Sequence, residues 1–230
     1  MKNFRTEKEL ASSYDAVWNK FILREEAKYY TWIADLLHID KGGRFLDIAC
    51  GAGFMLKEAA KRCLRAYGID ISSTAIRMAQ KEAPSSTLHI GSGEDIAFRD
   101  DFFDFITCLG SLEHYLNPER GVREIGRLLK KGGKACIALP NKWYWFDCLQ
   151  GMTRGLSSNH GQEIERFYSK EGACPLLEDN GLKIVRVYGY NKKLSLRARF
   201  KLFEILYNNF LRHIVWSNAS YSFVFICEKR

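Results

Sequence analysis

The sequence predicts an α/β protein built on a mostly parallel, seven-stranded sheet with helices on both faces. Short apolar runs alternate with amphipathic segments through the middle of the chain. The first apolar run ends at an acid and is followed by a glycine-rich turn, in the stretch RFLDIACGAGF. Strands that alternate with helices are connected by right-handed crossovers, which place the strands parallel in one sheet.

Seven segments are predicted as strands because apolar residues run together or alternate with polar ones in them. They are residues 44–49, 65–70, 86–91, 104–110, 134–140, 182–190 and 220–229.

Helices are predicted between these strands and before the first one. One begins at Phe54 after the glycines, one at Ser73, which suits an N-cap, and one at Pro118, which suits a first helical turn. The last of these is expected to end at residues 130–133, where two lysines precede two glycines. The predicted helices are residues 54–63, 73–82, 118–130 and 169–180, with further helix in 1–40, where aromatic and aliphatic residues recur at helical spacing.

The chain is predicted to be effectively one domain. Residues 1–40 form an N-terminal helical cap, and residues 41–230 form the main domain. The main domain is interrupted by an irregular lid at 141–168 and by a helical insertion at 191–217. The lid aromatics at 143–146 either line an apolar pocket or pack as core beneath a loop, and the second is the default for large aromatic side chains.

The composition, 47% hydrophobic and 27% charged, is typical of a globular protein. The charged N-terminus has no apolar core of a signal peptide, and no apolar run approaches the ~20 residues that span a bilayer. Seven cysteines are scattered without a CxxC pair. This pattern predicts reduced thiols, no metal site and a cytoplasmic location.

The net charge of +8 (35 basic minus 27 acidic residues) is concentrated in one region. Residues 192–213 hold six Lys or Arg against the single acid Glu204, a local charge of +5. Such a segment indicates either an anionic partner or a solvated helix face. Because residues 194–216 are also rich in aromatics, they suit an amphipathic helix at an anionic membrane surface. The alternative is a helix packed on the sheet or on a second subunit.

The glycine turn points to a nucleoside cofactor. Ligands of parallel sheets bind at the carboxyl ends of the strands, where the turn at residues 50–53 is predicted to lie. Glycines there permit positive φ and remove the Cβ that would block a ligand. Asp70 ends the second strand, 23 residues after Asp47. An acid at this interval typically accepts hydrogen bonds from ribose hydroxyls.

The details of the turn disfavour a nicotinamide cofactor. The pattern G-x-G-x-x-G requires a third glycine, whereas Leu56 occupies that position. The negative charge of Asp47 would repel a pyrophosphate. It suits a cation instead, such as an amino group beside a sulfonium.

With these features, the sequence resembles the class I S-adenosylmethionine-dependent methyltransferases, in particular the small-molecule branch that includes ubiquinone- and menaquinone-biosynthesis enzymes. The resemblance is close over residues 40–141 and loose over 165–190. It implies a Rossmann-like sheet whose last strand is antiparallel, with S-adenosylmethionine as cofactor. The motifs that carry it are LDIACGAGF (46–54), YGIDIS (67–72), the block at 90–118 and LKKGGKACIALPN (129–141).

The resemblance also implies a set of cofactor-binding residues. The methionine part would be held at the glycine turn, the ribose at the second acid, and adenine along the loop after the third strand. An aromatic residue near the N-terminus would lie at the cofactor's carboxylate. The residues are Tyr14, Asp47, Gly51, Gly53, Asp70, Ile71, Ser92, Gly93, Glu94 and Leu109.

Two positions depart from the family pattern. Ala49 replaces a glycine in the first motif. Ser92 stands where the family usually has an aspartate that accepts from the adenine amino group. Either Ser92 takes this role, or Glu94 or Asp95 replaces it.

Methyl transfer from a sulfonium needs mainly positioning and electrostatics, with a base only where the acceptor must lose a proton. His114, just beyond the fourth strand, is the first candidate for that base because histidine titrates near neutrality. The alternative is a structural role that holds the loop to the sheet. His160 in the lid is a second candidate, and Glu113 is expected to be a turn or cap residue.

The predicted function is therefore methyl transfer from S-adenosylmethionine to a small molecule: a lipid, a quinone precursor or a sugar conjugate. RNA methylation through residues 192–213 is one alternative, and a catalytically silent cofactor-binding protein is another. Methylation of nucleic-acid bases is disfavoured, because the amino-group methylators carry an N/D-P-P-Y-like motif where this chain has Leu-Gly-Ser-Leu (109–112).

Overall fold

The structure is a computed structural model of the 230-residue chain. It describes residues 6–20, 25–39, 42–154, 164, 166–193, 201–211, 213 and 217–230, with side chains omitted from the description at 150–154.

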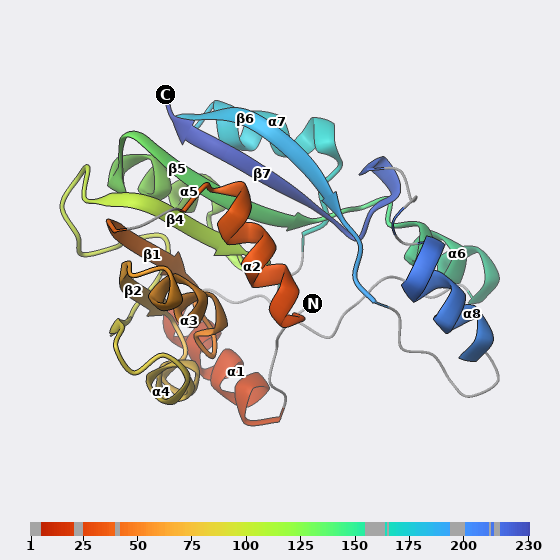
Figure 1. Cartoon of the computed structure of the whole chain (residues 1–230), viewed down its shortest axis with the longest axis horizontal. Helices are drawn as coiled ribbons and strands as arrows, with labels where there is room; N and C mark the ends of the chain where they lie inside the picture. Colours follow the sequence, from red (N-terminus) through yellow and green to blue (C-terminus); the bar gives the residue numbers. More distant parts are fainter. Residues whose placement is uncertain are drawn as a thin grey trace.

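A seven-stranded sheet of order β3-β2-β1-β4-β5-β7-β6 forms the centre of the molecule (Figure 1). The five strands β1 to β5 run parallel, whereas β7 is antiparallel to both β5 and β6. This confirms the predicted fold class, including the antiparallel last strand. The strands are β1 (Arg44–Ile48), β2 (Arg65–Asp70), β3 (Thr87–Ile90), β4 (Phe103–Leu109), β5 (Leu129–Pro140), β6 (Leu182–Tyr190) and β7 (Ser222–Lys229).

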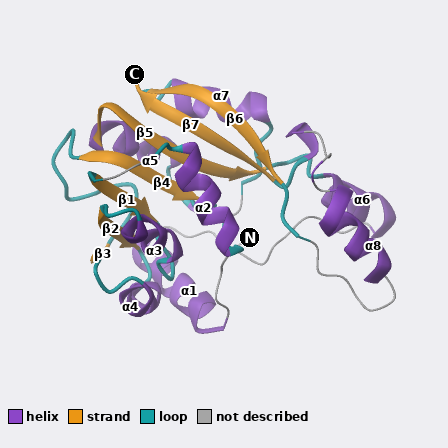
Figure 2. Cartoon of the chain, in the orientation of Figure 1, coloured by secondary structure: helices purple, strands orange, loops and turns teal. Residues whose placement is uncertain are grey.

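Helices cover both faces of the sheet, as Figure 2 shows. The N-terminal 40 residues supply two of them, as the helical spacing predicted. The α-helices are α1 (Glu7–Lys20), α2 (Ala27–Leu36), α3 (Phe54–Lys61), α4 (Ser73–Glu82), α5 (Pro118–Leu128), α6 (Trp145–Arg154), α7 (Lys170–Glu178) and α8 (Lys201–Leu206). A 3₁₀ turn, η1 (Leu112–His114), follows β4, and a π-helical turn (Tyr207–Leu211) continues α8.

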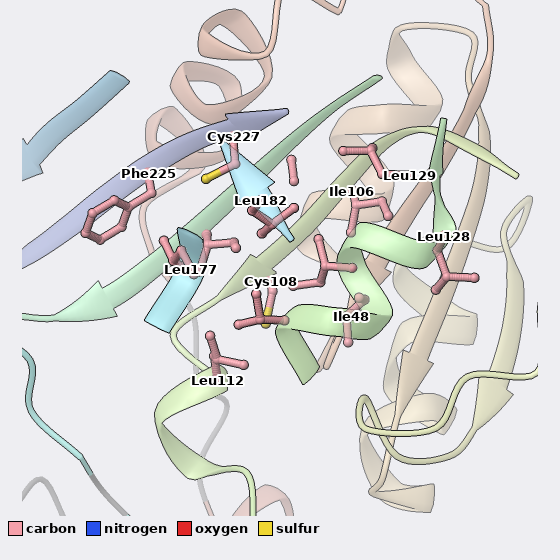
Figure 3. Close-up of a cluster of buried hydrophobic side chains, with 14 of the residues drawn as sticks. Ile48, Ile106, Cys108, Leu112, Leu128, Leu129, Leu177, Leu182, Phe225 and Cys227 are labelled. Carbon is pink, nitrogen blue, oxygen red and sulfur yellow. The ribbon is translucent and has the colours of Figure 1, made fainter. Parts of the chain in front are cut away.

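Alternation along the strands divides the interior into two hydrophobic cores. On β1, Leu46 and Ile48 point into one core, with side chains of α5 and α7, whereas Phe45 points into the other, with side chains of α2, α3 and α4. Figure 3 shows the first core, where Ile48 and Ile106 from the sheet lie near Leu128 of α5. Two-sided burial of this kind explains why the parallel strands read as apolar runs.

The start of β5 differs from the prediction. Residues 130–133 were expected to end a helix, but α5 ends at Leu128 and β5 begins at Leu129. Leu129 is fully buried and pairs with Phe103, while the next pair joins Phe105 to Lys134. Leu129 is therefore part of the strand because it pairs with β4. Residues 130–133, the two lysines and two glycines, form a bulge between the two pairs.

Two smaller differences concern a helix cap and the lid. The N-cap of α4 is Ser72, whose hydroxyl accepts from the Ala75 amide, so Ser73 is the first helical residue. The lid was expected to be irregular, yet α6 lies within it at Trp145–Arg154. An aromatic-rich start and an apolar face are compatible with either structure, so composition alone did not predict this helix.

Candidate functional site

A cavity of about 300 Å³ lies at the carboxyl ends of β1, β2 and β4. The strand order reverses between β1 and β4, so this is the switch point of the sheet, where ligands of such folds bind. Helices α1 and α2 close the cavity from above with side chains such as Trp18 and Tyr29. Of the predicted site residues, the structure places these in the lining: Tyr14, Asp47, Gly51, Asp70, Ile71, Ser92, Gly93, Glu94, Leu109 and His114.

The glycine turn after β1 has the strained backbone that its sequence indicated. Ala49, Gly51 and Gly53 all have positive φ, of 56°, 52° and 84°. A Cβ on Gly51 would lie 2.7 Å from the ring of Trp18, so this glycine admits the helix α1 side chain above it. Ala49 adopts a conformation that costs an L-residue about 1 kcal/mol and that glycine adopts without this cost.

Gly53 lies outside the cavity lining, unlike the other predicted cofactor-binding residues. It caps the N-terminus of α3, and a Cβ on it would lie 3.0 Å from Ala79 of α4. It is not among the cavity-lining residues that the structure describes. Its glycine character is explained by the left-handed cap and by the close approach of two helices.

Asp70 joins the turn after β1 to the turn after β2. One carboxylate oxygen accepts from the Gly51 amide at 2.8 Å, and the other accepts from the Ser72 amide at 2.8 Å. Burial raises the pKa of Asp70 to about 6, although these two hydrogen bonds oppose the rise. Each oxygen retains lone-pair capacity beyond one backbone bond, so the carboxylate can also receive sugar hydroxyls.

Asp47 is the second buried acid of the cavity. Its carboxylate accepts from the Thr107 hydroxyl at 2.6 Å. Burial raises the pKa of Asp47 to about 7; the Thr107 hydrogen bond opposes this rise, and the charge of Asp70 adds to it. Two neighbouring carboxyls with raised pKa values favour a ligand that carries positive charge.

The loop after β3 is organised by Glu94. Its two carboxylate oxygens accept from the amides of Leu116 and Asn117, at 2.7 and 3.1 Å. Its own amide donates to the Ser92 hydroxyl at 3.2 Å. Glu94 therefore fixes the loop that enters α5, and Ser92 is one of the residues that line the cavity.

Position 93 has to be a glycine because the Tyr115 side chain lies against it. The sequence analysis did not single out Tyr115. A Cβ on Gly93 would lie 2.0 Å from the Tyr115 hydroxyl, which is buried beside the Cys108 thiol. This contact joins residues 22 positions apart. No local pattern around either residue indicates it.

His114 lies at the edge of the cavity with its ring largely buried. Its Nδ1 is hydrogen-bonded to the Ile164 carbonyl, and its Nε2 lies 3.7 Å from a Glu113 carboxylate oxygen. The Tyr14 ring meets the imidazole edge-on, with ring centroids 6.1 Å apart. His160, the second predicted candidate, lies outside the described residues.

The segment that returns from the lid is anchored on η1. Besides the bond from His114 to Ile164, the Arg166 guanidinium donates to the carbonyls of Glu113 and Tyr115, at 3.2 and 2.6 Å. A structural role for His114, as one of these anchors, is therefore compatible with a chemical role.

Asp15 of α1 is a site residue that sequence analysis missed. Its carboxylate accepts from the Ser72 hydroxyl at 2.5 Å and from the Thr74 amide at 2.9 Å, at the N-terminus of α4. Although burial acts in the opposite direction, these hydrogen bonds hold the pKa of the Asp15 carboxyl below its usual value. Negative charge at a helix N-terminus is favourable, so this contact fixes α1 over the cavity.

A polar group from α2 and β6 forms another part of the lining. The Tyr190 hydroxyl donates to Glu25 at 3.0 Å, and the Lys192 ammonium lies 3.1 Å from the other oxygen of Glu25. Tyr29 packs on Tyr190 with ring centroids 4.4 Å apart. The lid aromatics at 143–146 were considered as cavity-lining residues, but none of these four described residues lines it. Trp145 packs on Tyr207 instead, at 5.3 Å between ring centroids.

The geometry defines a cofactor site of the nucleoside-binding kind: a glycine turn with positive φ, two buried acids and a cavity at the switch point of a parallel sheet. Within the described part of the chain, no group of three or more His, Cys, Asp or Glu residues could hold a metal ion.

Comparison with known proteins specifies the class. Residues 46–137 match the family model described as a methyltransferase domain. A ubiquinone biosynthesis O-methyltransferase of Alkalilimnicola ehrlichii is 32% identical over 116 residues, which are 48% of this chain and 47% of that protein. The 2-methyl-6-phytyl-1,4-hydroquinone methyltransferase of Arabidopsis thaliana is 35% identical over 111 residues, 46% of this chain and 32% of that protein. The chain thus spans half or less of the length of these curated relatives.

Solved structures share the fold at low sequence identity. An S-adenosylmethionine-dependent methyltransferase from Mesorhizobium loti matches with a TM-score of 0.66 and 14% identity, over 89% of this chain and 98% of that one. The cyclase SpnF matches with a TM-score of 0.67 and 16% identity, over 97% of this chain and 96% of that one. These likenesses establish the fold alone.

Residues 46–137 therefore form a methyltransferase domain of the class I, S-adenosylmethionine-dependent kind. This confirms the family that the motifs indicated, and the methyl donor of the family is S-adenosylmethionine. The residues present fit that cofactor, because the two buried carboxyls of Asp47 and Asp70 line the cavity beside the positive-φ glycine turn, where they would pair with its cationic groups and its ribose hydroxyls.

Replacing Asp15 with Ala should loosen α1 over the cavity. The Thr74 amide and the Ser72 hydroxyl would lose their shared acceptor, a loss comparable to that of a helix cap, about 1 kcal/mol. We expect hydrogen exchange of amides in residues 7–20 to become roughly fivefold faster. Ser12→Ala, at an exposed position of the same helix, is the matched control. Equal exchange in both variants would show that other contacts hold α1 in place.

Proposed function

We propose that this protein transfers a methyl group from S-adenosylmethionine to a small-molecule acceptor. The observation that carries this proposal is the pair of buried acids, Asp47 and Asp70, on either side of the positive-φ glycine turn. S-adenosylmethionine supplies an activated methyl group on a positively charged sulfur. The protein then has to bind the cofactor, align the acceptor and exclude water.

The proposed contacts follow the parts of the cofactor. Asp47 and Gly51 hold the methionine part, with Tyr14 near its carboxylate, and Gly53 shapes the turn from outside the cavity lining. Asp70 accepts from the ribose hydroxyls, and Ile71 lies against adenine. Leu109 lies behind the sulfonium, and Ser92, Gly93 and Glu94 border the adenine edge.

At the adenine edge we propose Ser92 as the partner of the amino group. Glu94 holds the loop through the backbone amides of Leu116 and Asn117, and we assign the amino group to Ser92 because it stands at the position of the family's aspartate. Asp95 is exposed to solvent. Ser92 is one of the cavity-lining residues and stands where the family usually has an aspartate.

For the acceptor we propose an apolar aromatic molecule of the quinone-precursor kind, ahead of another lipid or a sugar conjugate. Tyr29, Tyr30, Tyr190 and Tyr221 all line the cavity, and aromatic side chains favour stacking with a planar ring. The curated relatives named above include enzymes of quinone biosynthesis. We further propose a cytoplasmic location, which the seven free cysteines favour.

Two alternatives have distinguishable outcomes. RNA methylation would use the basic residues 192–213, and it predicts salt-sensitive RNA binding by the intact chain. A catalytically silent protein would bind the cofactor without transferring its methyl group. The shared fold of the cyclase SpnF supports keeping this second alternative, because the fold does not by itself specify methyl transfer.

We also propose that His114 accepts the proton of a hydroxyl-bearing acceptor. A carbonyl oxygen can only accept, so the bond to Ile164 places the proton on Nδ1 and leaves the lone pair on Nε2. Nε2 belongs to a side chain that lines the cavity. The same bond that anchors the lid segment therefore sets the tautomer that a general base requires.

Cofactor binding tests the proposal first. Asp70→Asn should weaken the binding of S-adenosylmethionine by roughly 10- to 100-fold in titration calorimetry, because charge-assisted hydrogen bonds to the ribose would be lost. Asp179→Asn, at an exposed position after α7, is the matched control, and NAD is the control ligand. The far-ultraviolet circular dichroism of each variant verifies its folding. Wild-type protein that binds neither S-adenosylmethionine nor its demethylated product would rule out the proposed function.

The affinity should also depend on pH. With a pKa of about 7 in the free protein, the Asp47 carboxyl is largely neutral at lower pH and must lose its proton to pair with the cationic cofactor. Affinity should therefore rise about tenfold between about pH 6 and about pH 8 and then level off. Calorimetry in buffers of different ionisation enthalpy would detect the released proton. Asp47→Asn should bind more weakly and with a flatter profile; an equally steep profile in that variant would assign the dependence to another group.

Substitution of His114 by Asn tests its role, because the Asn side-chain amide can still donate to the Ile164 carbonyl. His114→Asn should lower turnover of a hydroxyl-bearing acceptor by about 10²- to 10⁴-fold, with the affinity for S-adenosylmethionine unchanged. His114→Ala loses the anchor as well as the base, so its comparison with Asn separates the two roles. Near-normal turnover in the Asn variant, with a loss only in the Ala variant, would assign His114 to anchoring alone.

A further inference from the structure

The lining of the cavity extends to strands on both sides of the switch point. The glycine turn and the two buried acids follow β1 and β2, whereas β5, β7 and β6 lie beyond β4 in the sheet order (Figure 1). At the same edge of the sheet, Ser222 pairs with both Pro140 and Tyr190, and all three residues line the cavity. The proposed cofactor contacts come from α1, from β1, β2 and β4, and from the loop after β3. The side formed by β5, β7 and β6 is thus left for the acceptor.

An ion pair lies within this second side. Glu25, just before α2, and Lys192, just after β6, both line the cavity, and the Lys192 ammonium lies 3.1 Å from one Glu25 oxygen. The Tyr190 hydroxyl donates to the other Glu25 oxygen at 3.0 Å, and the Glu25 amide donates to the Tyr30 hydroxyl at 3.1 Å. The Lys192 ammonium also lies 5.5 Å from the centre of the Tyr221 ring. The Glu25 carboxylate is therefore fixed in position by contacts from two separate elements.

The next residue on each segment forms a second ion pair, which serves as a comparison. The Lys193 ammonium lies 3.0 Å from a Glu26 oxygen, so this pair also connects the start of α2 to the end of β6. Glu26 and Lys193 are not among the cavity-lining residues that the structure describes. The inner pair, Glu25 and Lys192, differs from the outer one by lining the cavity and by its contacts with tyrosines. A link between two elements explains the outer pair fully but leaves the position of the inner pair unexplained.

The charge of the inner pair distinguishes between classes of ligand. Glu25 and Lys192 together carry no net charge, and each carboxylate oxygen can accept more than one hydrogen bond. A neutral hydroxyl can donate to Glu25 while Lys192 stays in place. A carboxylate would have to compete with Glu25 for Lys192, and an ammonium group would have to compete with Lys192 for Glu25. The pair therefore favours a neutral hydrogen-bond donor, and the surrounding tyrosines favour a donor that is attached to a planar ring.

We propose that Glu25 determines acceptor specificity by accepting a hydrogen bond from a hydroxyl group of a neutral aromatic acceptor. Lys192 and Tyr190 act as positioning residues, because they hold the Glu25 carboxylate in place. This inference rests on the proposed function, since it assigns this side of the cavity to the methyl acceptor. A site built to bind a hydroxyl rejects an analogue that lacks it, because the charged group then loses a hydrogen bond that water supplied before binding.

Ligand-observed nuclear magnetic resonance titrations of the full chain test this proposal. The two probes are methylhydroquinone and its dimethyl ether, which has the same ring without a hydroxyl donor, each titrated with and without saturating S-adenosylhomocysteine. We expect the wild type to bind the hydroquinone roughly tenfold more tightly than the ether, because a hydrogen bond to a charged group is stronger than a neutral one. Glu25→Gln keeps the size of the side chain but removes its charge, so it should lower this ratio about fivefold. Its affinity for S-adenosylmethionine in calorimetry should equal that of the wild type.

Glu26→Gln is the matched control, because it removes the same kind of ion pair outside the cavity lining and should keep the wild-type ratio. A wild type without preference for the hydroquinone, or an equal ratio in all three proteins, would overturn the proposal. Tighter binding of benzoate than of the hydroquinone, lost in Lys192→Met, would also overturn it and assign the pair to an anionic ligand. Failure of the proposed function gives a different result, because the wild type would then not bind S-adenosylmethionine at all.

Discussion

The arrangement of the site depends on one carboxylate, that of Asp70, which accepts one backbone amide on each oxygen. One amide belongs to Gly51 and fixes the turn on which Trp18 packs; the other belongs to Ser72 and fixes the start of α4. Ser72 in turn caps α4 and donates its hydroxyl to Asp15, which holds α1 over the cavity. Two strands, two turns and a covering helix are therefore connected through hydrogen bonds that begin at a single buried acid.

This arrangement has an electrostatic cost in the protein without ligand. Burial raises the pKa of both Asp47 and Asp70, and the charge of Asp70 adds to the rise for Asp47. A core built only for stability would not contain such a pair, because unpaired buried charge is unfavourable and apolar replacement is often neutral or stabilising. When a positively charged ligand is bound, the two buried carboxylates are paired, and their charge then stabilises the complex. The cavity is thus less favourable when free than when a cationic ligand is bound, which couples stability to binding.

Contacts between sequence neighbours could be predicted from the sequence, whereas contacts between distant segments could not. The strands, the glycine turn and the two acids follow from local patterns, and the structure brings them together as expected. The beginning of β5 was missed because Leu129 is captured by Phe103, which precedes it by 26 positions. Asp15 was missed for the same reason, since its partner Ser72 is 57 residues away and nothing around either residue indicates the other.

The two sides of the cavity come from different parts of the chain, and this constrains how specificity can change. The turn and acids that suit the cofactor lie within residues 46–137, the range of the methyltransferase domain match. The tyrosines and the Glu25–Lys192 pair come from α2, from the end of β6 and from the entry to β7, outside that range. The carboxylate of Asp70 is held by Gly51 and Ser72, which belong to the first set, so under the proposed function substitutions in the second set would alter the acceptor side and leave these two bonds in place.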